Sequence, residues 1–216
     1  MSPDIKHFNP DVVLDDAVRV FWRQGLPATG IQALVSATGL SRSSLYATFG
    51  NKDGLYAAAL ERYIAQHSTP AFAALAADPS GLTAIEDFFT GLIGVRCSGP
   101  VAGWGCMVTN AHAGPECAAP EIRALLDAHH RSLQSAMRSA LSTAARLGQL
   151  DAAVEVDAAA AVLATLAYGV NLRSRAGAVP DTLRESVAGA LVALRARPAP
   201  APSPTPTPTP QEVPPQ

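Results

Sequence analysis

The sequence predicts an all-α fold in two helical regions, and three observations support this. Apolar residues recur every three or four positions through most of the chain. Residues that favour helix starts, such as Asn9 followed by Pro10, precede these runs, and glycines such as Gly25, Gly39 and Gly148 follow them. Hydrophobic residues make up 48% of the 216 residues, which is enough for a substantial core.

Four helices are expected in the first 66 residues, each with its own start or stop signal. The first begins after the Asn9 cap, and Gly25 ends it. A short helix ended by Gly39 follows, and Ser41 can cap the third. Asn51 can cap the fourth. The expected ranges are 10–24, 31–38, 42–49 and 52–66.

A second helical region is expected from 67 to 197, after a boundary somewhere in 67–80 near Asp78-Pro79. Its helices are a segment starting near 81, a short helix ending near 113, a long helix over 120–147, and two closing helices over 155–175 and 181–196. Residues 198–216 are rich in proline, so they cannot build a core and should be disordered or extended polyproline II.

Charge and cysteine content narrow the classes of function. The formal charge is −2 and the pI about 6.2, which excludes a globally basic nucleic-acid coat but allows a local basic face. Three cysteines with no CxxC pair fit neither a disulfide scaffold nor a zinc ribbon. No signal peptide or membrane-spanning run is expected, so a cytoplasmic location is the simplest.

The second and third helices, joined around Gly39, match a helix-turn-helix. Their apolar residues would pack against the first helix and leave a polar face on the third. Short polar side chains let a helix approach the floor of the DNA major groove, which is wide enough to admit one helix. The outward residues would be Arg42, Ser43, Ser44, Ala47 and Thr48. The alternative is a small three-helix bundle with a polar surface.

The segment GLPATGIQALVSATGLSRSSLYATFGNKDGLYAAAL resembles the DNA-binding domain of the TetR/AcrR family of one-component bacterial regulators. The resemblance covers roughly residues 10–60, and the helical remainder is similar to the family's variable C-terminal domain. It implies a sequence-specific DNA-binding transcriptional regulator, a repressor released from its operator by a small-molecule ligand. The segment GWGCMVTNAHAG is similar to a glycine-cysteine segment in one branch of the family.

The resemblance assigns DNA-contacting roles to eight residues. It implies that Thr29, Ser41, Tyr46 and Lys52 grip phosphates, and that Arg42, Ser43, Ser44 and Thr48 face the groove. Gly30 departs from the family's usual Ser or Thr and supplies no hydroxyl. Residues 1–66 hold six basic and six acidic side chains, a net charge of zero. Affinity for DNA must therefore come from the placement of the contacting side chains and from dimerisation, rather than from an overall positive charge.

The C-terminal region is expected to bind a small-molecule effector and to form a homodimer. Helices within 81–175 would enclose the ligand, and the fourth helix would link the two domains. Candidate ligand contacts are Phe88, Phe89, Trp104, Met107, Asn110, His112, Tyr168 and Asn171. The two final helices would form the dimer surface. Their apolar residues are Ala160, Leu163, Ala167, Val170, Leu183, Val187, Ala190, Leu191 and Leu194.

Three other classes of function stay open at this point. A helical enzyme is one, although no nucleophile elbow, phosphate-binding loop or HExxH motif occurs. A redox sensor that uses Cys106 is another, and the alternative for this residue is an inert buried thiol. An adaptor working through the proline-rich tail is a third class. No cofactor or metal is expected, because the spacing of His112, Cys117, His129 and His130 fits no ligand pattern.

Overall fold

The computed structural model describes residues 8–196, and within that range the chain is helical and has no strand. This confirms the expected all-α class. The expectations for the proline-rich tail lie outside the described residues. The elements are α1 (Pro10–Gln24), α2 (Ile31–Thr38), α3 (Arg42–Phe49), α4 (Lys52–Tyr63), the π-helical turn η1 (Ile64–Ser68), α5 (Thr69–Ala77), α6 (Leu82–Cys97), α7 (Met107–Ala113), the 3-10 turn η2 (Pro115–Ala118), α8 (Pro120–Arg146), α9 (Val156–Arg175) and α10 (Pro180–Val192).

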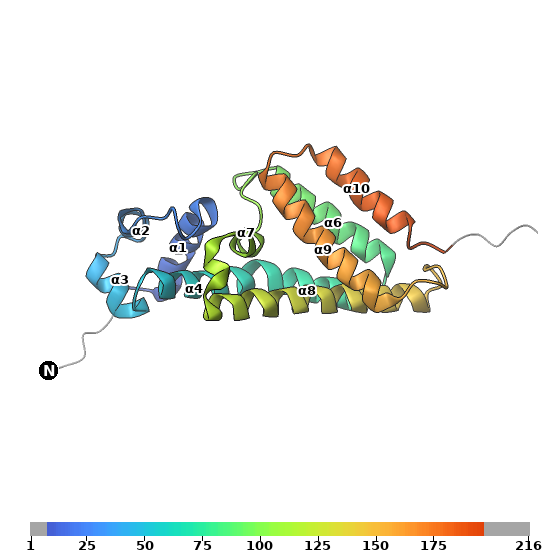
Figure 1. Cartoon of the computed structure of the whole chain (residues 1–216), viewed down its shortest axis with the longest axis horizontal. Helices are drawn as coiled ribbons and strands as arrows, with labels where there is room; N and C mark the ends of the chain where they lie inside the picture. The colour runs from blue at the N-terminus through green and yellow to red at the C-terminus, as the bar shows by residue number, and fades with distance from the viewer. Residues whose placement is uncertain (1–7, 197–216) are drawn as a thin grey trace, which may run out of the picture.

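The molecule is elongated, as Figure 1 shows, with α1, α2 and α3 at one end and α6, α9 and α10 at the other. The long helix α8 starts at the edge of the first group and runs beneath the second, beside the helix formed by α4, η1 and α5. The small N-terminal domain is thus joined to the larger one by two long, packed helices.

The helix ends follow the signals in the sequence. The side chain of Asn9 accepts a hydrogen bond from the Asp11 amide at 2.9 Å, and Asn51 accepts one from Gly54 at 2.8 Å. Gly39 ends α2 with φ of 69°, in the left-handed region that glycine adopts most easily. The Gly39 end fixes the short turn between α2 and α3, and with it the direction of α3.

The expected boundary within 67–80 falls partly inside a helix. From Lys52 to Ala77 the chain is helical without interruption, so the fourth helix continues past its expected end at 66. The helix ends before Asp78, which agrees with the break expected near Asp78-Pro79. Pro70 did not stop the helix because the widened π-helical turn η1 comes directly before α5. Proline lacks the N–H that an α-helical bond requires, and a wider turn accommodates such a residue.

One hydrophobic core runs through both domains. Its N-terminal members come from α1, α2, α3 and α4, and they include Phe21, Trp22 and Tyr63. The same core contains the N-cap residue of α7, residues of α7 itself and residues of the first turns of α8. These are Cys106, Met107, Val108, Ala111, Ile122 and Leu126. The DNA-binding region expected from the sequence is therefore not packed as an independent unit.

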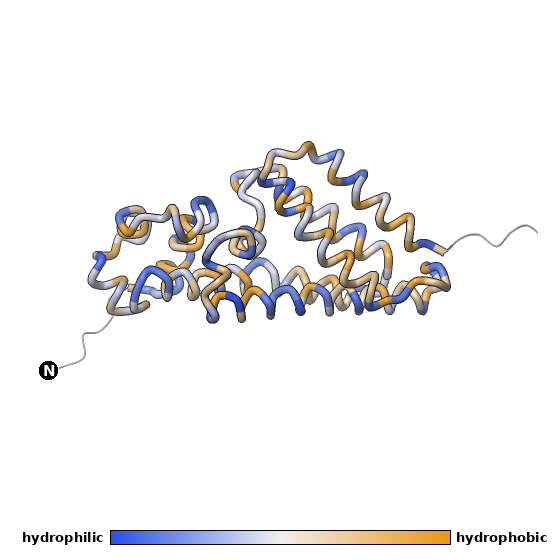
Figure 2. The backbone as a smooth tube through the Cα atoms, in the orientation of Figure 1, coloured by the Kyte–Doolittle hydropathy of each residue, from blue (hydrophilic) through white to orange (hydrophobic). Residues whose placement is uncertain are grey.

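A second core fills the C-terminal end. It contains residues of α9 and α10 that were expected at the dimer surface, so that expectation is corrected. Ala160, Leu163, Ala167 and Val170 are buried against α6, α8 and α10 of the same chain. Leu183, Val187 and Leu191 of α10 are buried in the same way. Figure 2 shows hydrophobic and hydrophilic residues alternating along α8, as expected of a helix with one buried face. The apolar stripes on α9 and α10 thus face inward, and another face of these helices is open.

We expect Leu126→Ala to lower the free energy of unfolding by about 2–5 kcal/mol, because Leu126 is 1% exposed in the shared core. Urea denaturation followed by circular dichroism and by tryptophan fluorescence measures this change. Both probes should report one transition, since the two domains share this core. Leu147→Ala is the matched control, and Leu147 is 54% exposed, so its effect should stay within about 0.5 kcal/mol. Two separate transitions would contradict the shared core.

Candidate nucleic-acid interface and candidate ligand cavities

Helix α3 is anchored on one side and open on the other. Leu45 is fully buried and holds α3 against the N-terminal core. The exposed side begins at Ser41, whose Oγ accepts a hydrogen bond from the Ser44 amide at 3.1 Å. The same oxygen lies 2.8 Å from Ser43 Oγ and 2.9 Å from Ser44 Oγ. A cluster of three hydroxyl groups therefore stands at the open N-terminus of α3.

Arg42 and Tyr46 form the second part of this open face. The Arg42 guanidinium lies 5.2 Å from the centroid of the Tyr46 ring. A cation over an aromatic face is attracted to it, which holds the arginine in place without an acidic partner. Thr48, one turn beyond Ser44, is half-buried on the same short helix. The face thus combines one cation, one phenol and several small hydroxyls.

Two residues with expected phosphate contacts have internal roles in this structure. Thr29 is buried, and its hydroxyl donates to the Gly25 carbonyl at 2.6 Å. The Lys52 ammonium donates to the carbonyls of Leu26 and Thr29 at 3.0 and 3.1 Å. Both side chains brace the loop between α1 and α2, because they donate to loop carbonyl groups that would otherwise lack a hydrogen-bond partner. The six other candidates all belong to α3 or cap it.

Three polar contacts join the N-terminal domain to the C-terminal one. Trp22 Nε1 donates to the Gly105 carbonyl at 2.9 Å, and the Tyr56 hydroxyl donates to Glu116 Oε1 at 3.3 Å. Burial, with a smaller effect of the Glu116 carboxylate, raises the pKa of the Tyr56 hydroxyl. In the third contact, Arg96 Nη2 of α6 donates to the Tyr63 hydroxyl of α4 at 3.0 Å.

Two connected cavities lie on the inner side of α5. The outer cavity has a volume of about 540 Å³ and opens between α1, η1, α5 and α6. The inner cavity has a volume of about 70 Å³ and reaches α7, α8 and α9. Five residues line both, which makes the outer cavity the approach to the inner one. These are His67, Ala71, Phe88, Leu92 and Arg96.

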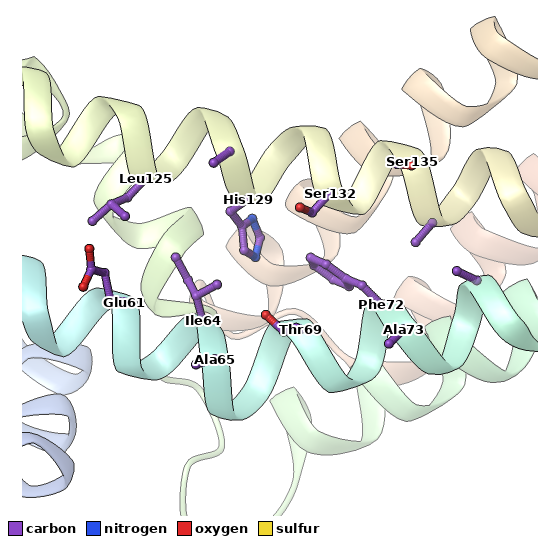
Figure 3. Close-up of a pocket in the computed structure, with 13 residues that line it drawn as sticks. Glu61, Ile64, Ala65, Thr69, Phe72, Ala73, Leu125, His129, Ser132 and Ser135 are labelled. Carbon is purple, nitrogen blue, oxygen red and sulfur yellow. The ribbon is translucent and has the colours of Figure 1, made fainter. Parts of the chain in front are cut away.

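A third hollow, which we call the α5–α8 groove, has a volume of about 480 Å³ on the other side of α5. Figure 3 shows residues of the helix formed by α4, η1 and α5 facing those of α8 across it. Small residues such as Ala73, Ala76 and Ala128 keep it open. His129 lines both this groove and the inner cavity.

The expected ligand contacts do not form one site. Phe88, Tyr168 and Asn171 line the inner cavity, whereas Met107 and Asn110 line a separate pocket of about 180 Å³ near Glu116. Three candidates line neither. Phe89 is fully buried core, Trp104 packs edge-on against Trp22, and His112 Nε2 lies 3.3 Å from the Tyr168 hydroxyl.

The side-chain amides of Asn110 and Asn171 differ in whether all their polar atoms have hydrogen-bond partners. Asn171 accepts from Arg96 Nε at 2.7 Å and donates to the Ala167 carbonyl at 2.8 Å, so protein groups satisfy it. Asn110 donates to the Trp104 carbonyl at 2.9 Å, but its Oδ1 is buried without a partner.

Among the polar residues of the inner cavity that sequence reasoning missed are Arg96, Thr109 and His129. Arg96 follows the buried Phe89 and Ile93 at helical spacing, so a charge on an apolar face was visible in the sequence. His129 lies between Leu126 and Leu133 in the same way. Thr109 carries no comparable signal, because a threonine in a short helix is ordinary.

His129 is the centre of a hydrogen-bonded chain. Its Nε2 lies 3.1 Å from Ser68 Oγ, and its Nδ1 lies 3.2 Å from the Tyr168 hydroxyl. Burial, with smaller effects of the neighbouring His112 and His130, lowers the pKa of His129 to about 4. The imidazole is therefore neutral at pH 7, which suits a group that exchanges hydrogen bonds with neutral hydroxyls.

Cys106 is 4% exposed and lines the inner cavity. Within residues 8–196, no cluster of three or more histidine, cysteine, aspartate or glutamate side chains is arranged to hold a metal ion. None of the helices described here combines the length and the apolar character needed to cross a membrane.

Comparison with known proteins decides the family. Residues 13–59 match the model of the bacterial regulatory proteins of the tetR family, and residues 81–190 match the tetracyclin repressor-like C-terminal domain. The chain belongs to the TetR family. The helix-turn-helix reading and the implied class are thereby confirmed: the protein is a DNA-binding transcriptional regulator, and the enzyme alternative is excluded.

Several relatives of this TetR-family chain match over nearly their whole length. The transcriptional repressor ComR of Escherichia coli (strain K12) is 28% identical over 190 residues, covering 88% of this chain and 90% of ComR. The TetR family regulator CifR, solved with 26 bp operator DNA, is 26% identical with a TM-score of 0.76, over 89% of this chain and 100% of that one. A putative regulator from Rhodococcus sp. RHA1 is 31% identical over 86% of this chain and 99% of that one, with a TM-score of 0.55.

We expect the stability of the protein to fall as pH decreases from about 6.5 to about 4. A histidine in the unfolded chain titrates near 6.5, whereas the pKa of His129 is about 4 in the fold. Between these values the unfolded state binds more protons, so the free energy of unfolding rises with pH there. The loss due to His129 should be on the order of 3 kcal/mol.

Urea denaturation at several pH values tests this dependence. His129→Gln should flatten the slope in this interval, whereas the control Gln134→Ala, on the same helix, should keep it. A slope that is the same in His129→Gln and in the parent protein would contradict the assignment.

Proposed function

We propose that this regulator is a repressor that binds a near-palindromic operator as a homodimer and leaves it when a small molecule binds the C-terminal domain. One observation carries the DNA-contacting part: the open N-terminal face of α3 gathers Ser41, Arg42, Ser43 and Ser44 beside Tyr46. An arginine fork suits guanine edges or phosphates, and hydroxyls suit both. In this proposal the protein acts in the cytoplasm, where operator DNA lies.

The proposed phosphate contacts rest on the same face. Ser41, Tyr46 and Thr48 are exposed or half-buried, whereas Lys52 and Thr29 hold the preceding loop in place. In this proposal Lys52 and Thr29 support the angle of α3 rather than carry the interface. The CifR complex with operator DNA is the relative that supports this mode of binding.

Homodimerisation supports specificity, because a single helix-turn-helix reads few bases and two copies read two half-sites one DNA turn apart. The outward faces of α9 and α10 are the proposed interface. They expose Val162 and Val192 at 62% and 66%. On the same two helices, Gly169 and Gly189 have open space where a side chain would stand, which allows another helix to approach closely.

Release would follow from the shared core. An effector that binds better to a conformer with different spacing between the two α3 helices shifts the population toward that conformer. Because α4 and α7 share one core with α1, a change in the cavities is transmitted to the helix-turn-helix by packing.

We expect Arg42→Ala to weaken operator binding by about 1–3 kcal/mol and to relax base preference at one position. Selection of bound duplexes from a random pool supplies the operator, and fluorescence anisotropy at fixed salt measures the affinity. The matched control is Arg138→Ala, because Arg138 is exposed on α8 and pairs with Asp157 far from α3. Equal losses in the two variants would refute the α3 interface.

We expect Val162→Glu together with Val192→Glu to convert the protein to a monomer, because two carboxylates would be buried in the proposed interface. Sedimentation velocity measures the oligomeric state. Val12→Glu, which changes a 55% exposed valine of α1, should leave the dimer intact. A dimer that survives the double substitution rules out this face.

A further inference from the structure

Arg96 is a buried cation without a counter-charge. It is 8% exposed, and among residues 8–196 no carboxylate lies within 4.0 Å of its guanidinium. Its partners are neutral: Nε donates to Asn171 Oδ1 at 2.7 Å, and Nη2 donates to the Tyr63 hydroxyl at 3.0 Å. The guanidinium also lies 5.5 Å from the centroid of a Trp22 ring.

Neutral partners satisfy hydrogen bonds but leave the charge in place. Removing a charge from water is costly unless an opposite charge compensates it. The charge acts on its surroundings: burial lowers the pKa of His67, and Arg96 lowers it further. Two acids line the outer cavity, but Asp78 accepts hydrogen bonds from Ser80 and Asp87 is exposed. Neither compensates the guanidinium.

Arg96 stands where the outer cavity meets the inner one. In the inner cavity, the hydroxyl of Thr109 is buried and has no hydrogen-bond partner, although the residue is only 5% exposed. Unpaired buried hydroxyls are rare and call for a missing partner. A cation and an unpaired hydroxyl donor therefore line the same small space.

The two volumes fit the two parts of an amphipathic molecule. The inner cavity, about 70 Å³, suits a group of a few atoms. The outer cavity, about 540 Å³, falls in the range of small-molecule sites, and apolar side chains such as Phe88, Leu92 and Val95 dominate its wall.

We propose that the effector is an organic carboxylate with an apolar body. Its carboxylate pairs with Arg96 and accepts a hydrogen bond from Thr109, and its body lies in the outer cavity against Phe88 and Leu92. This assignment rests on the proposed effector-binding function and names the chemical class of the effector. It also connects the ligand to the DNA-binding domain, because Arg96 contacts Tyr63 of α4 and Trp22 of α1.

Matched compounds of one shape and different charge test the class. Phenylacetate, phenylacetamide and phenethylamine share a body, and octanoate, octanamide and octylamine form a second set. Isothermal titration calorimetry on the full chain should show one of the carboxylates binding at least about tenfold more tightly than its amide and its amine. Quenching of tryptophan fluorescence should accompany binding, since Trp22 lines the outer cavity. Equal binding of acid and amide, preference for the amine, or no binding of either acid at millimolar concentration overturns the proposal.

Two variants locate the anion. Arg96→Gln should abolish the preference for the carboxylate over the amide. Thr109→Val, which keeps the side-chain shape, should weaken carboxylate binding about three- to tenfold. It should not destabilise the fold, because the lost hydroxyl has no partner. Thr109→Val therefore keeps the test valid if Arg96→Gln does not fold. Ser135→Ala, a hydroxyl removed from the α5–α8 groove, is the control and should bind as the parent does.

Operator binding, measured separately by anisotropy without any ligand, distinguishes failure of the effector assignment from failure of the proposed DNA-binding function. If the duplex is bound but Thr109→Val and Ser135→Ala both bind carboxylate like the parent, the inference fails and the proposed DNA function stands. If the carboxylate binds as expected but no duplex is bound, the inference stands and the proposed DNA function fails.

Discussion

The packing of α1 and α4 against α7 and the first turns of α8 is the constraint on which the rest of the structure depends. Phe21, Trp22 and Tyr63 share one apolar core with Met107 and Leu126, so neither domain can shift without repacking the other. Well-packed interiors have discrete arrangements rather than continuous ones. The direction of α3 and the shape of the cavities are therefore two properties of the same core.

Polar contacts at this junction also join the two domains. Trp22 donates to the Gly105 carbonyl while its ring lies beneath Arg96, and Arg96 donates to Tyr63. On the far side of α4, the Arg62 guanidinium donates to Asp15 at 2.9 Å and to Asp11 at 2.8 Å. The Arg62 hydrogen bonds hold the pKa of Asp15 below its usual range. Helix α4 is thus fixed to α1 on one side and to the cavity wall on the other.

The helices, their caps and the α3 surface could be predicted from the sequence, because capping and periodicity are local properties. Asn9, Ser41 and Asn51 cap as their sequence context indicates. Properties that depend on which face meets which neighbour could not be predicted. Ala160 and Leu163 form an apolar stripe whether it packs within the chain or against a second copy, and only the three-dimensional arrangement shows the first. Lys52 likewise reads as a free cation until the carbonyls of Leu26 and Thr29 are placed beside it.

The π-helical turn between Tyr63 and Thr69 has a consequence for the geometry of the whole molecule. A π turn holds about one residue more than an α turn, and each residue of an α-helix accounts for about 100° of rotation. If η1 tightened to α-helical geometry, α4 would swivel relative to α5 by about that angle. His67 and Ser68, which border the inner cavity, lie within this turn. A small change of helical pitch there would rotate α4, the helix that follows α3 in the chain.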